Sequence, residues 1–212
     1  MKITLFLILI NIIVFVYSLT NFEYFIDNYG FSVNAFLSGH PETLITSLFL
    51  HGSFIHLASN MIALLFLGGA VESKVKSWQY ILVYFLAGVV GNLSFFIPIF
   101  GYDAMTIGVG ASGAISGLVG LGIFISPGKL TMFPFIIPIP FAIAGAIFLL
   151  TTSALLFSTQ EQIAYPAHLL GIAAGAAFGF AWSKHRIKNL IIFIFLVALI
   201  IALPYILRTV LG

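Results

Sequence analysis

The sequence predicts an all-α protein that crosses a membrane several times. Of its 212 residues, 61% are hydrophobic and 7% are charged, and the mean hydropathy is +1.19. About a quarter of the residues in a soluble domain are charged, so most of this protein's surface must face lipid. The apolar residues also fall into runs of about 20, the length that a helix needs to cross a bilayer.

Seven such runs follow one another, and we expect each to form a transmembrane helix. They cover residues 3–20, 53–71, 78–98, 112–126, 139–157, 166–183 and 189–208. The first run follows Lys2 and therefore has features of a signal peptide. It is longer than such a peptide requires, and no clear small-residue cleavage site follows it. We therefore expect it to be a retained span.

The distribution of lysine and arginine predicts the orientation of these spans. Seven of the eight basic residues share one side of the predicted membrane, and Arg208 is the exception. Five of the six acidic residues lie on the other side, and Glu72 is the exception. Basic loops usually face the cytoplasm. The sequence thus predicts a multi-pass protein of the cell membrane with a cytoplasmic amino terminus and an external carboxyl terminus.

Composition excludes several classes of function. Without cysteine, the chain can form neither disulfides nor thiolate metal sites, and it has no thiol nucleophile. A net charge of +2 without a basic patch gives no sign of a nucleic-acid partner. His51, His56 and His168 are conceivable metal ligands, but His51 and His56 do not share a helical face and no carboxylate completes the set. We expect no metal and no cofactor. A transporter would show mid-span charges or an internal repeat, and neither is present.

Two external stretches differ from ordinary loops. Residues 21–52 are rich in aromatic side chains, which favour the membrane interface, so we expect a partly inserted loop. Residues 97–111 contain glycine and lead into an unusually short fourth span, whose 15 or so residues reach only ~22 Å across a core of ~30 Å. Irregular backbone at that depth requires protein or a water-filled cavity around it. The sequence therefore predicts a wet pocket, open to the outside, at the start of span four.

Ser112 and His168 are the candidate nucleophile and base. Ser112, in Gly110-Ala111-Ser112-Gly113, lies at the start of span four, where unpaired N–H groups and the helix dipole favour a developing negative charge. A serine that merely caps the helix is the alternative. His168 lies about one turn into span six, at a similar predicted depth, and an imidazole is well suited to accept a hydroxyl proton. A histidine that only packs is the alternative there.

His56 and Asn60 are candidate stabilisers of an oxyanion. They are four residues apart and so share one face of span two, in the same external layer as Ser112 and His168. An imidazole and an amide facing one cavity are suitable donors to an oxyanion, although Asn60 could equally form an interhelical hydrogen bond. No carboxylate accompanies the group within a span, so the sequence favours a Ser–His dyad over a triad.

These residues lie in motifs that resemble the rhomboid family of intramembrane serine proteases. The motifs are His51-Gly-Ser-Phe-Ile-His56-Leu-Ala-Ser-Asn60, Gly68-Gly-Ala-Val-Glu72, Gly108-Val-Gly-Ala-Ser112-Gly and Ala167-His168-Leu-Leu-Gly171. The resemblance implies a six-helix catalytic domain over residues 1–183 and an additional carboxyl-terminal helix over 184–212. It also implies that Ser112 attacks, that His168 is the base, and that Gly110 shapes an oxyanion hole containing His56 and Asn60.

The resemblance further implies an intramembrane endopeptidase that cleaves single-span membrane proteins at small residues near the outer end of the span. The alternative is a non-catalytic relative that binds transmembrane helices for quality control. Two departures from the family pattern stand out. Glu42-Thr43 replaces a Trp-Arg pair common in the external loop, and Ser116 replaces an aromatic residue one turn after the nucleophile. Ser116 is thus a rival hydroxyl. Neither the physiological substrate nor the oligomeric state is defined by the sequence.

Glycine spacing predicts how the two catalytic helices meet. Gly171, Gly175 and Gly179 line one face of span six, and Gly113 and Gly117 have the same spacing on span four. Small residues at this interval let membrane helices approach closely. We therefore expect spans four and six to pack through these glycines and to bring His168 within hydrogen-bonding reach of Ser112.

Overall fold

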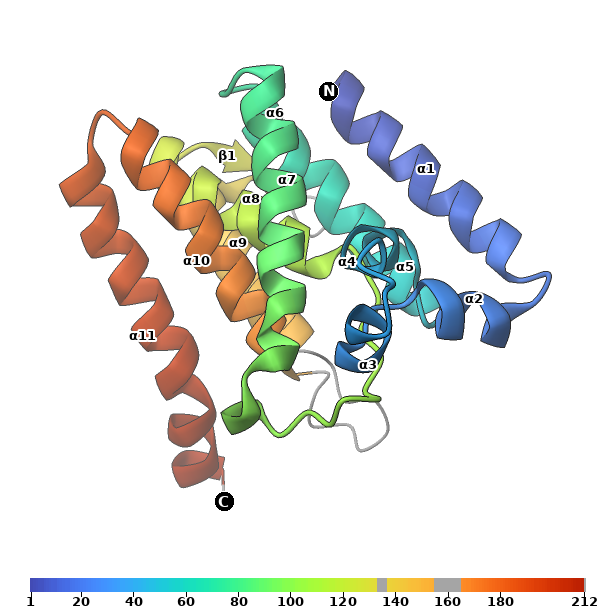
Figure 1. Ribbon diagram of the computed structural model, residues 1–212. Helices are drawn as coiled ribbons and strands as arrows, with labels where there is room; N and C mark the ends of the chain where they lie inside the picture. Colours follow the sequence, from blue (N-terminus) through green and yellow to red (C-terminus); the bar gives the residue numbers. More distant parts are fainter. Residues whose placement is uncertain (133–136, 155–164, 212) are drawn as a thin grey trace.

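The computed structural model describes residues 1–132, 137–154 and 165–211, and almost all regular structure there is helical (Figure 1). In chain order the elements are α1 (Lys2–Ser18), α2 (Phe22–Tyr29), α3 (Val33–Leu37), α4 (Thr43–Thr46), η1 (Ser47–Phe49), α5 (Phe54–Ala63), η2 (Leu64–Gly68), α6 (Gly69–Glu72), α7 (Ser77–Asn92), η3 (Leu93–Phe96), η4 (Pro98–Phe100), α8 (Ser112–Ile125), β1 (Leu130–Thr131), β2 (Ile139–Pro140), α9 (Phe141–Ala154), α10 (Tyr165–Trp182) and α11 (Arg186–Leu211).

Helical segments cover most of the described part of each of the seven predicted spans; residues 155–157 of the fifth lie outside the described part. Within the described residues, two helices are long and apolar enough to cross a membrane, Phe54–Glu72 and Ser77–Phe96. The apolar helices over Lys2–Ser18, Ser112–Ile125, Phe141–Thr151 and Pro166–Trp182 are shorter. The mostly helical class is confirmed, whereas the count of seven spans stays a prediction.

One short hairpin departs from the predicted all-α class. β1 and β2 pair in antiparallel register, with Leu130 opposite Pro140 and Thr131 opposite Ile139, in the connection between α8 and α9. Proline at position 140 disfavours helical backbone at Ile139, so α9 begins at Phe141 rather than at the predicted residue 139. The Thr131 hydroxyl donates to the carbonyl of Phe66 at 3.3 Å, and this bond attaches the hairpin to the π-helical segment η2.

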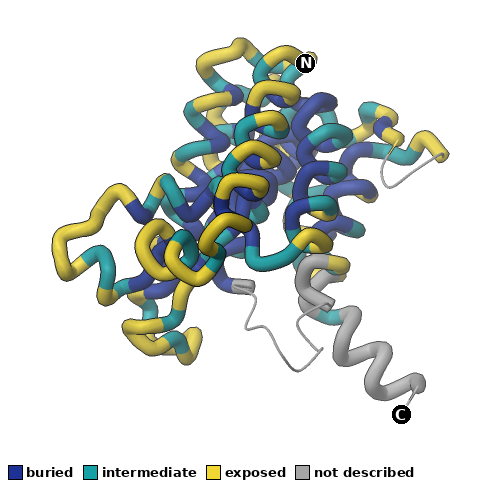
Figure 2. Tube along the Cα trace, turned by 90° about the vertical axis from the view of Figure 1, so that its right-hand side faces the viewer, coloured by how far each residue is buried: buried dark blue, intermediate teal, exposed yellow. Residues whose placement is uncertain are grey.

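Helix α8 lies at the centre of the molecule and packs against both α7 and α10, which also contact each other (Figure 1). Every residue from Gly113 to Phe124 is buried, and Figure 2 shows the buried interior surrounded by partly exposed helices. A Cβ atom on Gly171 or Gly175 would overlap the carbonyl of Gly113 or Gly117, respectively. The predicted glycine packing of spans four and six is therefore confirmed.

Polar contacts connect the outer helices to this centre. The Glu72 carboxylate accepts hydrogen bonds from the N–H groups of Ile3 and Thr4 at 3.1 and 2.9 Å, and it pairs with the Met1 ammonium at 3.0 Å. This role at the start of α1 explains why Glu72 lies on the basic side of the charge map. On the opposite edge of the molecule, Asn189 of α11 donates to the carbonyl of Phe124 at 2.6 Å.

The stretch of residues 21–52, predicted to be a partly inserted loop, contains the short helices α2, α3 and α4 and the 3₁₀ helix η1. Phe31 is fully buried and forms a two-bond antiparallel bridge with Gly108. Tyr24 and Tyr29 are 49% and 38% exposed. The stretch is therefore partly packed onto residues 97–111, which are irregular after η4 as predicted.

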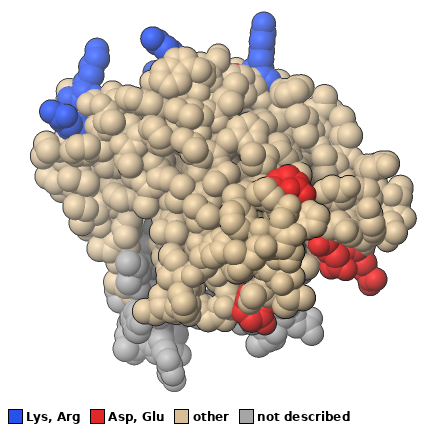
Figure 3. All heavy atoms as spheres, in the orientation of Figure 1, with Lys and Arg blue, Asp and Glu red and all other residues tan. Residues whose placement is uncertain are grey.

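The two signs of charge separate along the molecule. Figure 3 shows Lys and Arg side chains at the end where α1 begins and where α10 is joined to α11, and Asp and Glu side chains farther down the visible face. This separation agrees with the charge map that the sequence predicts. Which end faces the cytoplasm stays a prediction.

Candidate active site

Ser112 is the first residue of α8. The irregular stretch of residues 101–111 leads from the edge of the molecule to its centre (Figure 1). Helix α8 therefore begins among other helices. As the first helical residue, Ser112 has a backbone N–H without an acceptor inside the helix. Its side chain is partly exposed, although the helix that follows is buried. The start of α8 therefore presents both a hydroxyl and an unpaired N–H group, and the wet pocket predicted there stays a prediction.

His168 lies in the first turn of α10, shortly after Pro166, and is 3% exposed. Its Nε2 atom lies 2.8 Å from the Ser112 Oγ atom, a normal hydrogen-bond distance. Among the described residues, His168 Nδ1 has no hydrogen-bond partner. The structure thus joins the two predicted residues directly, and in the described part of the chain no carboxylate extends the pair to a triad.

Gly110 lies next to His56 and Asn60 of α5. Its φ angle is +122°, a conformation that glycine adopts readily and other residues rarely. A Cβ atom there would lie 2.8 Å from His56 Nε2 and 3.8 Å from Asn60 Nδ2. The structure therefore brings His56 and Asn60 together with Gly110. Gly110 is two residues before Ser112 in the chain.

His56 and Asn60 of α5 each form local contacts. The Ser53 hydroxyl caps the helix by accepting a hydrogen bond from the N–H of His56 at 3.1 Å, and Asn60 Nδ2 donates to the His56 carbonyl at 3.1 Å. The imidazoles of His51 and His56 meet edge to face, with ring centroids 5.0 Å apart. His56 is partly exposed and Asn60 is buried, so their position next to Gly110 is defined by the fold.

Two residues that sequence reasoning missed position this loop. The Ser47 carbonyl accepts a hydrogen bond from the N–H of Gly110 at 2.9 Å. Asn92 on α7 in turn donates to the Ser47 hydroxyl at 2.9 Å and to the Leu44 carbonyl at 3.0 Å. Both side chains are buried. Asn92 could have been noticed in the sequence, because it is a polar residue within the apolar run over 78–98.

The rival hydroxyl of Ser116 lies in a different environment. Ser116 is fully buried, and its hydroxyl donates to the carbonyl of Ser112 at 2.8 Å. This local bond within α8 directs the Ser116 hydroxyl toward backbone. Ser112, and not Ser116, is the serine that meets His168.

Metal binding has no candidate within the part of the chain that the structure describes. No group of three or more His, Asp or Glu residues that could hold a metal ion occurs there. His51 and His56 are in ring contact, whereas His168 contacts Ser112. The expectation that the site holds no metal stays a prediction.

A serine hydroxyl hydrogen-bonded to a histidine at a helix start is the arrangement by which hydrolases activate a serine nucleophile. The fold and the site thus define a mostly helical protein in which a serine and a histidine are hydrogen-bonded at the start of a central helix. The Rhomboid domain family matches residues 38–185, which include Ser112, His168 and all the residues around them described above. The chain belongs to the rhomboid family, whose members are membrane proteins.

Curated relatives support the same assignment. RHOMBOID-like protein 12, mitochondrial, from Arabidopsis thaliana is 33% identical over 197 residues, which cover 85% of this chain and 57% of the relative. Rhomboid protease GluP from Bacillus subtilis is 32% identical over 106 residues, covering 50% of this chain and 20% of the relative. Putative rhomboid protease YdcA from the same bacterium is 33% identical over 87 residues, covering 41% and 42%. The chain therefore corresponds to only part of each relative's length.

Proposed function

We propose that the protein is an intramembrane serine endopeptidase with Ser112 as nucleophile and His168 as general base. The observation that carries this proposal is the 2.8 Å distance between His168 Nε2 and Ser112 Oγ at the start of a central helix. The proposal draws further support from membership of a family in which relatives are named as rhomboid proteases.

In the proposed reaction, Ser112 Oγ attacks the carbonyl carbon of the scissile peptide bond while His168 Nε2 accepts the hydroxyl proton. The carbonyl oxygen becomes an oxyanion. His168 then gives the proton to the leaving amine as the C–N bond breaks, and an acyl-enzyme on Ser112 remains. Water, deprotonated by His168, hydrolyses the ester and restores both residues. This is the general order of events at a serine–histidine pair.

The oxyanion would be stabilised by three donors around Gly110: the Ser112 backbone N–H, the Asn60 amide and the His56 imidazole. Preorganised donors of this kind supply much of the rate enhancement in acyl transfer, since removing one typically costs ~10²–10³-fold in rate. Gly110 belongs to this group because a side chain at its position would occupy the space next to the His56 ring.

The proposed substrates are single-span membrane proteins, cleaved at small residues near the end of the span closest to Ser112. We further propose that the catalytic domain covers residues 1–183 and that residues 184–212 form an additional helix, with the basic end of the molecule in the cytoplasm. The cell membrane is the proposed location. The Arabidopsis relative is named as mitochondrial, so an organelle membrane is the alternative.

A non-catalytic rhomboid-like protein that binds transmembrane helices is the competing function, and labelling with a fluorophosphonate probe separates the two. The purified protein in detergent should become covalently labelled at Ser112, as identified by peptide mass spectrometry. His168→Ala should remove the labelling because the hydroxyl then has no base. A folded wild-type protein that stays unlabelled would support the binding function instead.

A further inference from the structure

A hollow at the basic end of the molecule is separate from the proposed active site. It is a shallow depression with a cavity volume of only about 10 Å³, and it lies between the end of α6, the end of α8 and the start of α9. Val71, Gly122, Ile125 and Phe141 form its apolar walls. A Cβ on Gly122 would overlap the Phe141 ring, so glycine at this position allows α8 and α9 to meet and close the inner end of the hollow.

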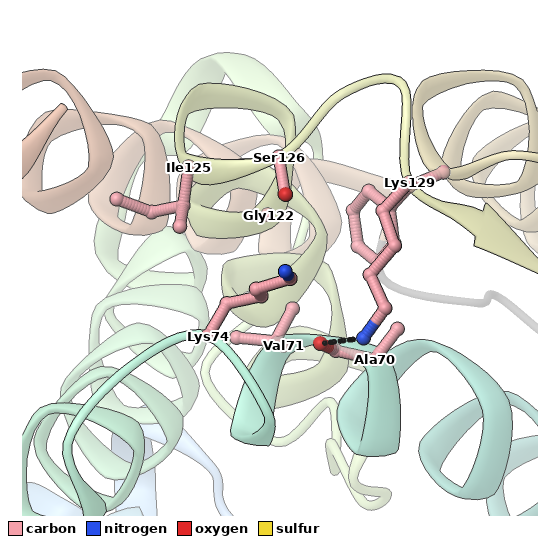
Figure 4. A pocket seen from close by; sticks show the side chains of 8 residues that line it. Ala70, Val71, Lys74, Gly122, Ile125, Ser126 and Lys129 are labelled. Carbon is pink, nitrogen blue, oxygen red and sulfur yellow. Dashed lines mark hydrogen bonds between the residues drawn. The ribbon is translucent and has the colours of Figure 1, made fainter. Parts of the chain in front are cut away.

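Two lysines and a serine surround the mouth of this hollow. Figure 4 shows the side chains of Lys74 and Lys129 directed toward it from two sides, with the Ser126 hydroxyl facing the same space. Lys129 Nζ donates to the Ala70 carbonyl at 2.9 Å and also to the Ser73 hydroxyl. These bonds place one positive charge at the carboxyl-terminal end of α6, where the helix dipole favours a cation.

The positive charge at the mouth is not balanced within the described residues. Among the described residues, ion pairs join Met1 to Glu72 and His40 to Glu42, and neither pair includes Lys74 or Lys129. Glu72 is close to Lys74 in sequence, but its carboxylate binds the Met1 ammonium and the N–H groups of Ile3 and Thr4 at the start of α1. Partial burial and the neighbouring Lys74 ammonium lower the pKa of Lys129. Two adjacent ammonium groups without a carboxylate partner favour binding of an anion.

The surroundings favour an anion that carries an apolar part. The walls behind the two ammonium groups are apolar. On the hairpin beside Lys129, the side chains of Leu130 and Met132 are 59% and 50% exposed. In a membrane protein, exposed apolar side chains next to lysines mark the level where acyl chains meet headgroups. A small soluble anion would gain nothing from this apolar surface.

We propose that Lys74, Lys129 and Ser126 form a binding site for the phosphate of an anionic phospholipid in the leaflet at the basic end of the molecule. The two ammonium groups contact the phosphate at the mouth of the hollow, and the lipid's apolar part lies along Leu130 and Met132. Because the site joins the ends of α6 and α8 to the start of α9, a bound lipid stabilises the packing around the central helix.

The test uses the full chain purified in a neutral detergent. Thermal unfolding is followed during titration with dioctanoyl phosphatidylglycerol, and in parallel with dioctanoyl phosphatidylcholine and with glycerol phosphate. We expect a saturable rise of the unfolding midpoint with phosphatidylglycerol, a smaller rise with phosphatidylcholine and none with glycerol phosphate. Equal rises with both lipids, or an equal rise with glycerol phosphate, would overturn the proposal of an anionic lipid.

Lys74→Gln is the informative variant, because Lys129→Gln would also remove the bonds at the end of α6. Lys184→Gln is the matched control, since Lys184 is exposed at the same end of the molecule and away from the hollow. One lysine contact near a membrane surface corresponds to about a five-fold change in affinity. Lys74→Gln should therefore raise the half-saturating phosphatidylglycerol concentration about five-fold, and Lys184→Gln should leave it unchanged. Equal effects of the two variants, or no effect of Lys74→Gln, would contradict a defined site.

Discussion

The backbone of Gly171 on α10 lies directly against the carbonyl of Gly113 on α8. Gly171 is one turn after His168, and Gly113 follows Ser112 in the chain. The contact therefore lies beside the 2.8 Å hydrogen bond between His168 and Ser112. Lipid provides no hydrophobic drive for helix association, so contact of this kind determines how closely the two helices approach. The separation of the Ser112 and His168 side chains depends on the absence of a side chain at Gly171.

Gly171→Val should reduce peptide cleavage strongly. A branched side chain at this contact pushes α10 away from α8, and a misplacement of ~1 Å can cost ~10²-fold in rate. Ala173→Val is the matched control because Ala173 is exposed on another face of α10. Cleavage rate and thermal unfolding should be measured together, with Gly171→Ala as a milder variant in case the valine prevents folding. Equal, mild effects at positions 171 and 173 would show that the glycine contact does not position His168.

Gly110→Ala should lower activity through both conformation and space. Alanine is strained at a φ angle of +122°, at a cost of ~1–3 kcal/mol, and its Cβ would displace the His56 ring. Gly39→Ala is the control: Gly39 also has a positive φ angle, +96°, but open space around it. We expect both variants to lose some thermal stability and only Gly110→Ala to lose turnover. Loss of activity in Gly39→Ala alone would contradict this account of the loop.

His56→Ala and Asn60→Ala should each slow turnover by ~10²–10³-fold without preventing fluorophosphonate labelling. Labelling needs the activated Ser112 hydroxyl, whereas peptide cleavage also needs stabilisation of the oxyanion. Comparing the two readouts on the same purified variants tests this difference. If both variants cleave at the wild-type rate, the group around Gly110 is not an oxyanion site.

Chelators should leave cleavage unchanged. The proposed chemistry uses a hydroxyl and an imidazole, and no metal-ligand group occurs among the described residues. The measurement is the cleavage rate after dialysis against a strong chelator, compared with dialysis against buffer. Complete inactivation that zinc restores would replace the dyad mechanism with a metal-dependent one.

Patterns that repeat along the chain were predictable from the sequence. Apolar runs, glycine spacing and the separation of charge each come from many residues, so they predicted the helices, the contact of α8 with α10 and the two ends of the molecule. The approach of Ser112 to His168 also followed, because two spans with the same sense place residues at similar depth. These features depend on periodicity, which a single sequence records directly.

Features that depend on individual tertiary contacts were not predictable. The bridge between Phe31 and Gly108 attaches the stretch of residues 21–52 to residues 97–111, and neither residue type predicts its partner. Asn92 was recognisable as an unusual polar residue, but its hydrogen bond to Ser47 requires two helices to be placed first. Likewise, Glu72 stood out on the basic side of the charge map, and only the position of α1 explains it.

Cleavage by Ser112→Ala is the most direct test of the proposed function. The wild type and the variants Ser112→Ala and Ser116→Ala should be reconstituted with a single-span substrate that has small residues near the end of its span. Ser112→Ala should lose cleavage by up to ~10⁶-fold while unfolding at the wild-type temperature. Ser116→Ala should remain active, because its hydroxyl only donates to the Ser112 carbonyl. Wild-type cleavage by folded Ser112→Ala would contradict the assignment of Ser112 as nucleophile.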